Sequence, residues 1–221
     1  MPAPSPMEGA PHTRGRTLDH AAGVYDILVP LMTLGQEGRY RKVAIGLLGL
    51  TGRERVLDVG CGTGVLTRQI AGRLNGSEAC VYGLDAAPEM IQVARRRALG
   101  LQHIRFDVGV AETLAYEDEA FDCAVSTFFF HHIDAELKRR SLAELRRVLK
   151  PGGCLVIVDV DVPSTWFGHL CAWSGYWLFK QEEIRENIRG ELRRALADIP
   201  FRMVSRVAHY SGYVTVFRAV K

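Results

Sequence analysis

The sequence predicts an α/β fold built on a mostly parallel β-sheet with helices on both faces. From residue 54 onward, short apolar runs of strand length alternate with stretches in which apolar residues recur at helical spacing. Such alternation is typical of right-handed β-α-β units, which cover both faces of a parallel sheet with helices. The last two apolar runs are separated only around Ser211-Gly212, so these two strands must be antiparallel.

The elements follow one another in a regular order. The expected parallel strands are short apolar runs, often with β-branched residues, at 56–60, 79–85, 104–109, 121–129 and 154–162. Helices are expected at about 20–50, 64–74, 88–99 and 134–149, and one charged helix at 182–198 precedes the final hairpin. The helix at 134–149 is the clearest, because four leucines form one stripe: Leu137, Leu142, Leu145 and Leu149.

Composition favours a single soluble domain in the cytoplasm. The chain has 221 residues, 48% of them hydrophobic, and five scattered cysteines without a CxxC pair, which suits a reducing compartment. Residues 1–18 are predicted to be a disordered lead-in, and 19–221 a single domain. No signal peptide or membrane-spanning run is expected, and no metal site. A net charge of +3 gives little reason to expect a nucleic-acid partner.

The stretch 54-ERVLDVGCGTGVLTRQI-70 predicts a ligand-binding turn after the first strand. Ligands of open parallel sheets bind at the carboxyl ends of the strands, and glycines let the backbone pass close to a flat ligand. No GxxxxGK[ST] motif is present, which excludes a P-loop. The dinucleotide pattern GxGxxG is strained, because Val65 and Thr67 stand where its third glycine would fall.

What remains is glycine at alternate positions, 60, 62 and 64, which suits a nucleoside joined to an amino acid. Asp58 precedes the glycines and suits an amino group, while the helix N-terminus beyond them suits a carboxylate. Asp85 ends the second strand, where a carboxylate can accept both ribose hydroxyls. The alternative is that Asp85 caps the helix that begins near Pro88.

Four motifs together make the chain resemble the class I S-adenosylmethionine-dependent methyltransferases: VLDVGCGTG, VYGLDAAPEMIQVAR, FDCAVSTFFFHHI and LRRVLKPGG. The resemblance implies a Rossmann-like, seven-stranded sheet whose last strand is antiparallel, with S-adenosylmethionine as cofactor. Within this family the chain is similar to the ubiquinone/menaquinone-biosynthesis C-methyltransferases, on YDILVPLMTLGQEGRYR and on residues 138–163.

The resemblance also implies which residues contact the cofactor, with Tyr25 closing over it as part of an N-terminal helical lid at 19–52. The family usually has Asp or Asn where this chain has Val110, so backbone groups and apolar walls are expected to hold the adenine. The predicted cofactor-binding residues are Tyr25, Asp58, Gly60, Gly62, Thr63, Gly64, Thr67, Asp85, Ala86, Met90, Val110, Ala111, Glu112 and Ser126.

Methyl transfer by in-line displacement needs positioning, and a base only where the acceptor loses a proton. His131 and His132 follow the fourth strand, so one of them is a candidate general base or acceptor-orienting group. The alternative is that one caps the next helix or packs against Phe129. The aromatic stretch 166–179, within an acceptor-side insertion at 163–180, could complete the core, wall a pocket for a small apolar or aromatic acceptor, or touch a membrane surface.

Two other functions remain open at this point. One is a non-catalytic S-adenosylmethionine-binding module or sensor, and the other is an NAD-dependent oxidoreductase, which the glycine spacing disfavours. Nucleic-acid methylation is not expected, because no Pro-Pro-aromatic or Pro-Cys motif is present. The sequence does not indicate the acceptor, the atom methylated or the oligomeric state.

Overall fold

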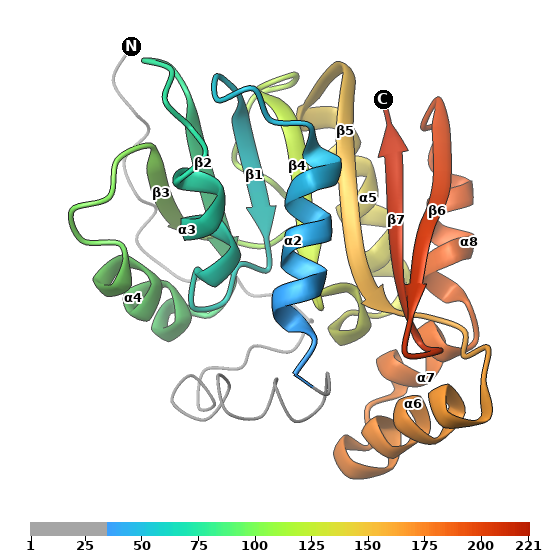
Figure 1. Cartoon of the computed structure of the whole chain (residues 1–221). Coiled ribbons are helices and arrows are strands. Elements are labelled where there is room, and N and C mark those ends of the chain that lie inside the picture. The colour runs from blue at the N-terminus through green and yellow to red at the C-terminus, as the bar shows by residue number, and fades with distance from the viewer. Residues whose placement is uncertain (1–34) are drawn as a thin grey trace.

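The computed structural model describes residues 35–221, which form one seven-stranded β-sheet with helices on both faces (Figure 1). The strand order is β3-β2-β1-β4-β5-β7-β6. Strands β1 to β5 are parallel, and β7 is antiparallel to both of its neighbours, β5 and β6. The predicted fold class is therefore confirmed. The strands are β1 Arg55–Val59, β2 Cys80–Asp85, β3 Ile104–Val108, β4 Phe121–Thr127, β5 Leu149–Val160, β6 Met203–Tyr210 and β7 Val214–Val220.

Helices cover the two faces of the sheet in separate groups. Helices α2, α3 and α4 pack on one face, and α5 and α8 pack on the other (Figure 1). Strand β1 contributes to the hydrophobic core on each face: Val56 packs on the α2–α4 side and its neighbour Leu57 packs on the α5–α8 side. The helices are α2 Glu37–Leu48, α3 Val65–Ala71, α4 Pro88–Arg97, the 3₁₀ turn η1 Phe130–His132, α5 Ala135–Val148, α6 Trp166–Phe179, α7 Glu182–Ile188 and α8 Glu191–Asp198.

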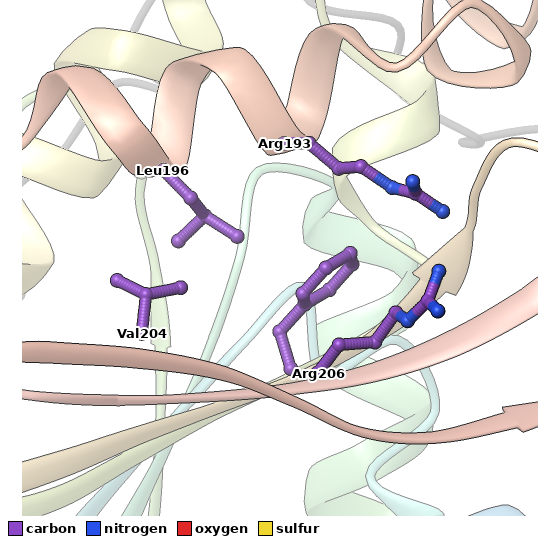
Figure 2. A pocket seen from close by; sticks show the side chains of 5 residues that line it. Arg193, Leu196, Val204 and Arg206 are labelled. Carbon is purple, nitrogen blue, oxygen red and sulfur yellow. The ribbon is translucent and has the colours of Figure 1, made fainter.

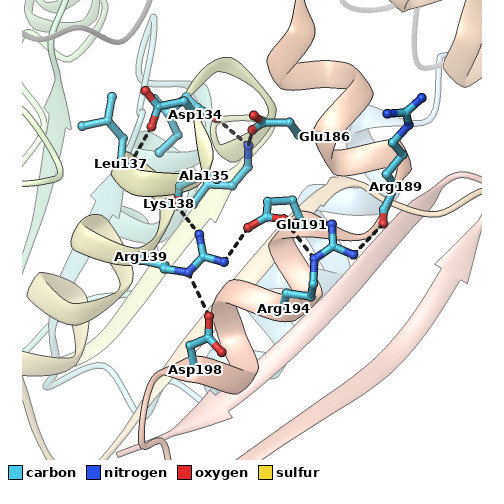
Figure 3. A network of polar contacts seen from close by, with 11 residues as sticks. Asp134, Ala135, Leu137, Lys138, Arg139, Glu186, Arg189, Glu191, Arg194 and Asp198 are labelled. Carbon is cyan, nitrogen blue, oxygen red and sulfur yellow. Dashed lines mark hydrogen bonds and ion pairs between the residues drawn. The ribbon is translucent and has the colours of Figure 1, made fainter.

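Helix α5 buries three of the four leucines of the predicted stripe and binds α8 through charged side chains; the fourth, Leu149, is the first residue of β5. Leu137, Leu142 and Leu145 are at most 2% exposed. On the polar side, the Arg139 guanidinium donates to Glu191 at 2.7 Å and to Asp198 at 2.8 Å (Figure 3). These two acidic side chains of α8 therefore lie on the side of the helix that faces α5.

Two elements differ from the sequence prediction. The charged stretch 182–198 is two helices, because Gly190 adopts φ +87°, a left-handed conformation that ends α7 and begins α8. Strand β5 begins at Leu149, five residues before the predicted start. Its pairing with β4 is irregular between the Phe121/Leu149 and Cys123/Cys154 pairs, so residues 150–153 bulge out of the ladder.

The carboxyl ends of the parallel strands lie at one edge of the sheet, where the predicted site residues follow β1, β2, β3 and β4. Helix α6 lies beyond this edge, next to α7 (Figure 1). Among the residues described, none of the helices is both long and apolar enough to cross a membrane. The predicted lead-in 1–18, Tyr25 and the first part of the predicted lid, residues 19–34, lie outside the described residues.

Candidate active site

The turn after β1 is anchored to the neighbouring strand β2. The backbone N–H groups of Gly60 and Cys61 both donate to the Leu84 carbonyl, at 2.8 and 3.0 Å. Gly60, Gly62 and Gly64 all have positive φ angles, of 71°, 53° and 74°. Residues other than glycine rarely adopt this backbone conformation, so the alternating glycines allow the chain to turn here.

The three glycines have different surroundings. A Cβ atom on Gly60 would lie 2.7 Å from the Phe129 side chain, and one on Gly64 would lie 2.8 Å from the Phe106 ring. A Cβ atom on Gly62 would meet no atom within 4 Å. Gly60 and Gly64 therefore admit aromatic rings of the protein itself, whereas Gly62 borders the open space that a ligand needs.

Asp85, at the end of β2, holds this turn in place. One carboxylate oxygen accepts the Gly62 N–H at 2.8 Å, and the other accepts the Ala87 N–H at 2.9 Å, just before α4 begins. The side chain therefore holds the backbone just before α4, but it does not cap that helix, whose N-cap is Ala87 with no side-chain cap bond. Asp85 is half-buried beside Gly62, and its role toward ribose hydroxyls stays a prediction.

Asp58 lies beneath the turn and faces the protein interior. It is 1% exposed, and the fully buried Thr67 donates its hydroxyl to it at 2.6 Å. Burial raises the pKa of Asp58 to about 7; the Thr67 hydrogen bond opposes this rise and the nearby Asp85 carboxylate adds to it. In this arrangement the Asp58 carboxyl braces β1 against α3.

The other predicted cofactor contacts surround the same edge of the sheet. Thr63, Met90, Val110 and Ala111 are buried, and Ala86 and Glu112 are half-buried. Ser126 is fully buried and donates its hydroxyl to the Val59 carbonyl at 2.9 Å, which ties β4 to β1 beside the turn. The role of each of these residues in cofactor binding stays a prediction.

His131 forms a close pair with a residue that the sequence analysis did not single out. Its Nδ1 atom lies 2.7 Å from Oδ1 of Asp159, a fully buried residue near the end of β5. The two Asp159 oxygens also accept the N–H groups of Phe130 and Val160, each at 2.7 Å. Asp159 is an acceptor in these bonds, so Nδ1 of His131 is the donor, and the bond fixes the orientation of the ring.

His132 stacks against His131 but contacts a different side chain. The two ring centroids are 4.0 Å apart, and Nδ1 of His132 lies 3.4 Å from Oε1 of Gln181. Neither histidine caps the following helix, because Asp134 does so by accepting the Leu137 N–H at 2.8 Å. The two histidines therefore differ: His131 is held by a buried carboxylate, and His132 by a weak contact with an amide.

The arrangement brings two kinds of group to one edge of the sheet. The first is an open glycine turn beside a carboxylate, which fits a nucleoside with an amino acid tail. The second is a histidine oriented by a buried aspartate, which is an arrangement suited to accepting a proton.

Comparison with known proteins agrees with this geometry. Residues 56–153 match the family model described as a methyltransferase domain. The chain is 36% identical, over 143 residues, to a ubiquinone/menaquinone biosynthesis C-methyltransferase of Geobacter sp. (strain M21), covering 63% of this chain and 60% of that protein. It is 39% identical, over 142 residues, to a demethylmenaquinone methyltransferase of Thermus thermophilus, covering 63% and 62%. The chain thus spans about three-fifths of the length of the curated relatives it matches.

A solved structure of an S-adenosylmethionine-dependent methyltransferase from Aquifex aeolicus shares the fold. It superposes with a TM-score of 0.60 at 24% identity, over 81% of this chain and 88% of that one. The strand order and the antiparallel β7 agree with the sheet that the sequence motifs imply. In its motifs, its match to the methyltransferase-domain model over residues 56–153 and its fold, the chain is similar to the S-adenosylmethionine-dependent methyltransferases.

Proposed function

We propose that this protein transfers a methyl group from S-adenosylmethionine to a small apolar or aromatic acceptor of the quinone-precursor type. The observation that carries the proposal is the position of two features at one edge of the sheet: the open Gly62–Asp85 turn and the His131–Asp159 pair. The quinone class comes from the relatives, a ubiquinone/menaquinone biosynthesis C-methyltransferase and a demethylmenaquinone methyltransferase.

The residues of the turn fit the cofactor. Gly62 leaves free space, Asp85 offers acceptors to the ribose, and Met90 and Ala111 supply buried apolar surface for the adenine. When bound, S-adenosylmethionine supplies a methyl group on a positively charged sulfur. The chain contributes by holding that group and the acceptor in line and by excluding water, which supplies much of the rate in such displacements.

His131 would accept the proton that a carbon or phenol acceptor releases. Asp159 holds the Nδ1–H and fixes the ring, so Nε2 can take the proton while the adjacent carboxylate stabilises the resulting imidazolium. His132, whose Nδ1 lies 3.4 Å from Oε1 of Gln181, would orient the acceptor.

Helix α6 would form one wall of the acceptor site. It is packed on one side, because Ala172 is 3% exposed and a Cβ on Gly168 would overlap the Gly212 backbone. Its outer side carries Trp166, Leu170 and Trp177, which are 79%, 60% and 70% exposed. Tryptophans exposed in this way suit brief contact with a membrane surface from which an apolar acceptor could be taken.

A labelled-methyl transfer assay tests the proposal. We expect transfer to demethylated quinone precursors or small phenols, and calorimetry should detect binding of S-adenosylhomocysteine but not of NADH. His131→Ala and Asp159→Asn should lower kcat by about 10²-fold or more while the S-adenosylhomocysteine Kd stays unchanged. His132→Ala serves as the matched control, with a smaller effect on kcat. Cofactor binding without transfer to any of these acceptors would instead indicate a binding module.

A further inference from the structure

A cleft of about 440 Å³ lies on the other side of the molecule from the α2–α4 layer, between α8 and the last two strands. Its lining residues are Arg193 and Leu196 from α8, Val204 and Arg206 from β6, and Phe217 from β7. Figure 2 shows the guanidinium groups of Arg193 and Arg206 at one end, with Leu196 and Val204 facing each other at the other end. The cleft therefore has a cationic end and an apolar end.

Arg193 is held rigidly at the cationic end. Its Nε and Nη2 atoms donate to Asp161 at 2.8 and 2.6 Å, and Asp161 is fully buried. The Thr215 hydroxyl donates to the same carboxylate at 2.6 Å. Asp161 therefore neutralises Arg193 and fixes its orientation, and both oxygens of Asp161 are already occupied.

Arg206 supplies positive charge that no carboxylate neutralises. Its side chain is exposed, and the part of the chain that the structure describes provides it with no ion pair or hydrogen bond. The acidic residues of α8 are engaged on the opposite side of that helix, where Glu191 and Asp198 bind Arg139 (Figure 3). Arg193, Asp161 and Arg206 together leave one net positive charge at this end of the cleft.

The apolar end is formed by side chains already in place. Leu196 and Phe217 are 1% and 4% exposed, so they form a fixed floor, and Val204 is 42% exposed above it. The volume lies within the range of roughly 300–1,000 Å³ that is usual for small-molecule sites. A planar guanidinium suits bidentate binding of a carboxylate or phosphate.

We propose that this cleft binds an amphipathic anion, with a carboxylate or phosphate head on Arg206 and an aliphatic or aromatic tail over Leu196, Val204 and Phe217. The site is separate from the His131–Asp159 pair and from the glycine turn, so it would hold a second ligand. The proposal does not depend on the acceptor of the methyl group.

The test uses the full chain and four probes: octanoate, octyl phosphate, 1-octanol and inorganic phosphate. Calorimetry gives each Kd, and ¹³C-methyl NMR of Leu196 and Val204 reports whether the tail lies in the cleft. We expect one or both amphiphilic anions to bind more tightly than 1-octanol and inorganic phosphate, and to shift these methyl signals. Octanoate and octyl phosphate then distinguish a carboxylate from a phosphate head.

Two variants probe the two ends of the cleft, and a third is the control. Arg206→Gln and Val204→Glu should each raise the Kd of the preferred anion by about tenfold. The first removes the cation that binds the head, and the second places a negative charge at the apolar end. Arg202→Gln removes an exposed arginine outside the cleft and should change the Kd less than twofold. The proposal is overturned if neither amphiphile binds at 1 mM, if inorganic phosphate or 1-octanol binds as tightly, or if Arg206→Gln leaves the Kd unchanged.

Discussion

Replacing Asp58 with Asn should change how stability depends on pH. The Asp58 carboxyl is buried beneath the glycine turn, where the Thr67 hydroxyl is the one side-chain donor that the described residues give to an ionised Asp58. Asn has nearly the same shape and can accept the same hydroxyl, but it does not ionise. The variant therefore isolates the cost of the buried charge from the contribution of the hydrogen bond.

The size of the effect follows from the pKa of Asp58, which burial raises from 3.8 to about 7. Between these values the unfolded chain releases the proton while the native protein keeps it, so the native protein binds more protons. Stability must then fall as pH rises from about 4 to about 7, and the fall levels off above the native pKa. Three units at about 1.4 kcal/mol each give a loss of about 4 kcal/mol, which Asp58→Asn should not show.

Urea denaturation of both proteins from pH 4.5 to pH 8 measures this difference. The free energy of unfolding of Asp58→Asn minus that of the parent should grow by several kcal/mol with increasing pH. Any hydrogen bond that the new amide lacks adds an offset that does not vary with pH. Parallel curves for Asp58→Asn and the parent would refute the reasoning.

Three further predictions concern the turn and α6. Gly60→Ala should destabilise the fold by about 2 kcal/mol or more, because the new Cβ would overlap Phe129. Gly62→Ala should cost about 1 kcal/mol of stability and should mainly weaken the binding of S-adenosylhomocysteine. Thermal melts measure the first effect and calorimetry the second. Asp85→Asn should raise the S-adenosylhomocysteine Kd by about tenfold in calorimetry, since a charged acceptor for the ribose is lost, and an unchanged Kd would count against the ribose role. Trp177→Gln should reduce co-sedimentation with lipid vesicles without lowering the melting temperature, because this side chain is 70% exposed; equal sedimentation would exclude membrane contact at this position.

The fold was predictable because its signals are local in the sequence. Each parallel strand is a short apolar run. The turn is specified by three glycines, because its positive φ angles favour glycine at these positions. The short link at Ser211-Gly212 was enough to fix the antiparallel direction of β6 and β7. Where the prediction was wrong, the signal was ambiguous: Gly190 lies inside a helical charge pattern, and it divided one expected helix into α7 and α8.

The candidate site was less predictable because its decisive contacts join distant parts of the chain. The sequence indicated His131, but its partner Asp159 lies 28 positions away, on β5. One signal was available. The run CLVIVDVDV has two aspartates within an apolar strand, and buried carboxylates require donors from elsewhere in the fold. The run therefore indicates that both aspartates need donors, but it does not indicate which residues donate. That depends on β5 lying between β4 and β7.

Asp159 and Asp161 contribute to two separate sites. Asp159 lies near the end of β5 and Asp161 directly follows that strand, and both side chains are fully buried. Asp159 accepts two backbone N–H groups and the His131 ring, so it depends mainly on the backbone around η1. Within the described residues, the Asp161 side chain accepts from side-chain donors alone, those of Arg193 and Thr215. Loss of the Asp159 charge should therefore affect the histidine, and loss of the Asp161 charge should affect the cationic end of the α8 cleft, although the two residues are only two positions apart at the end of β5.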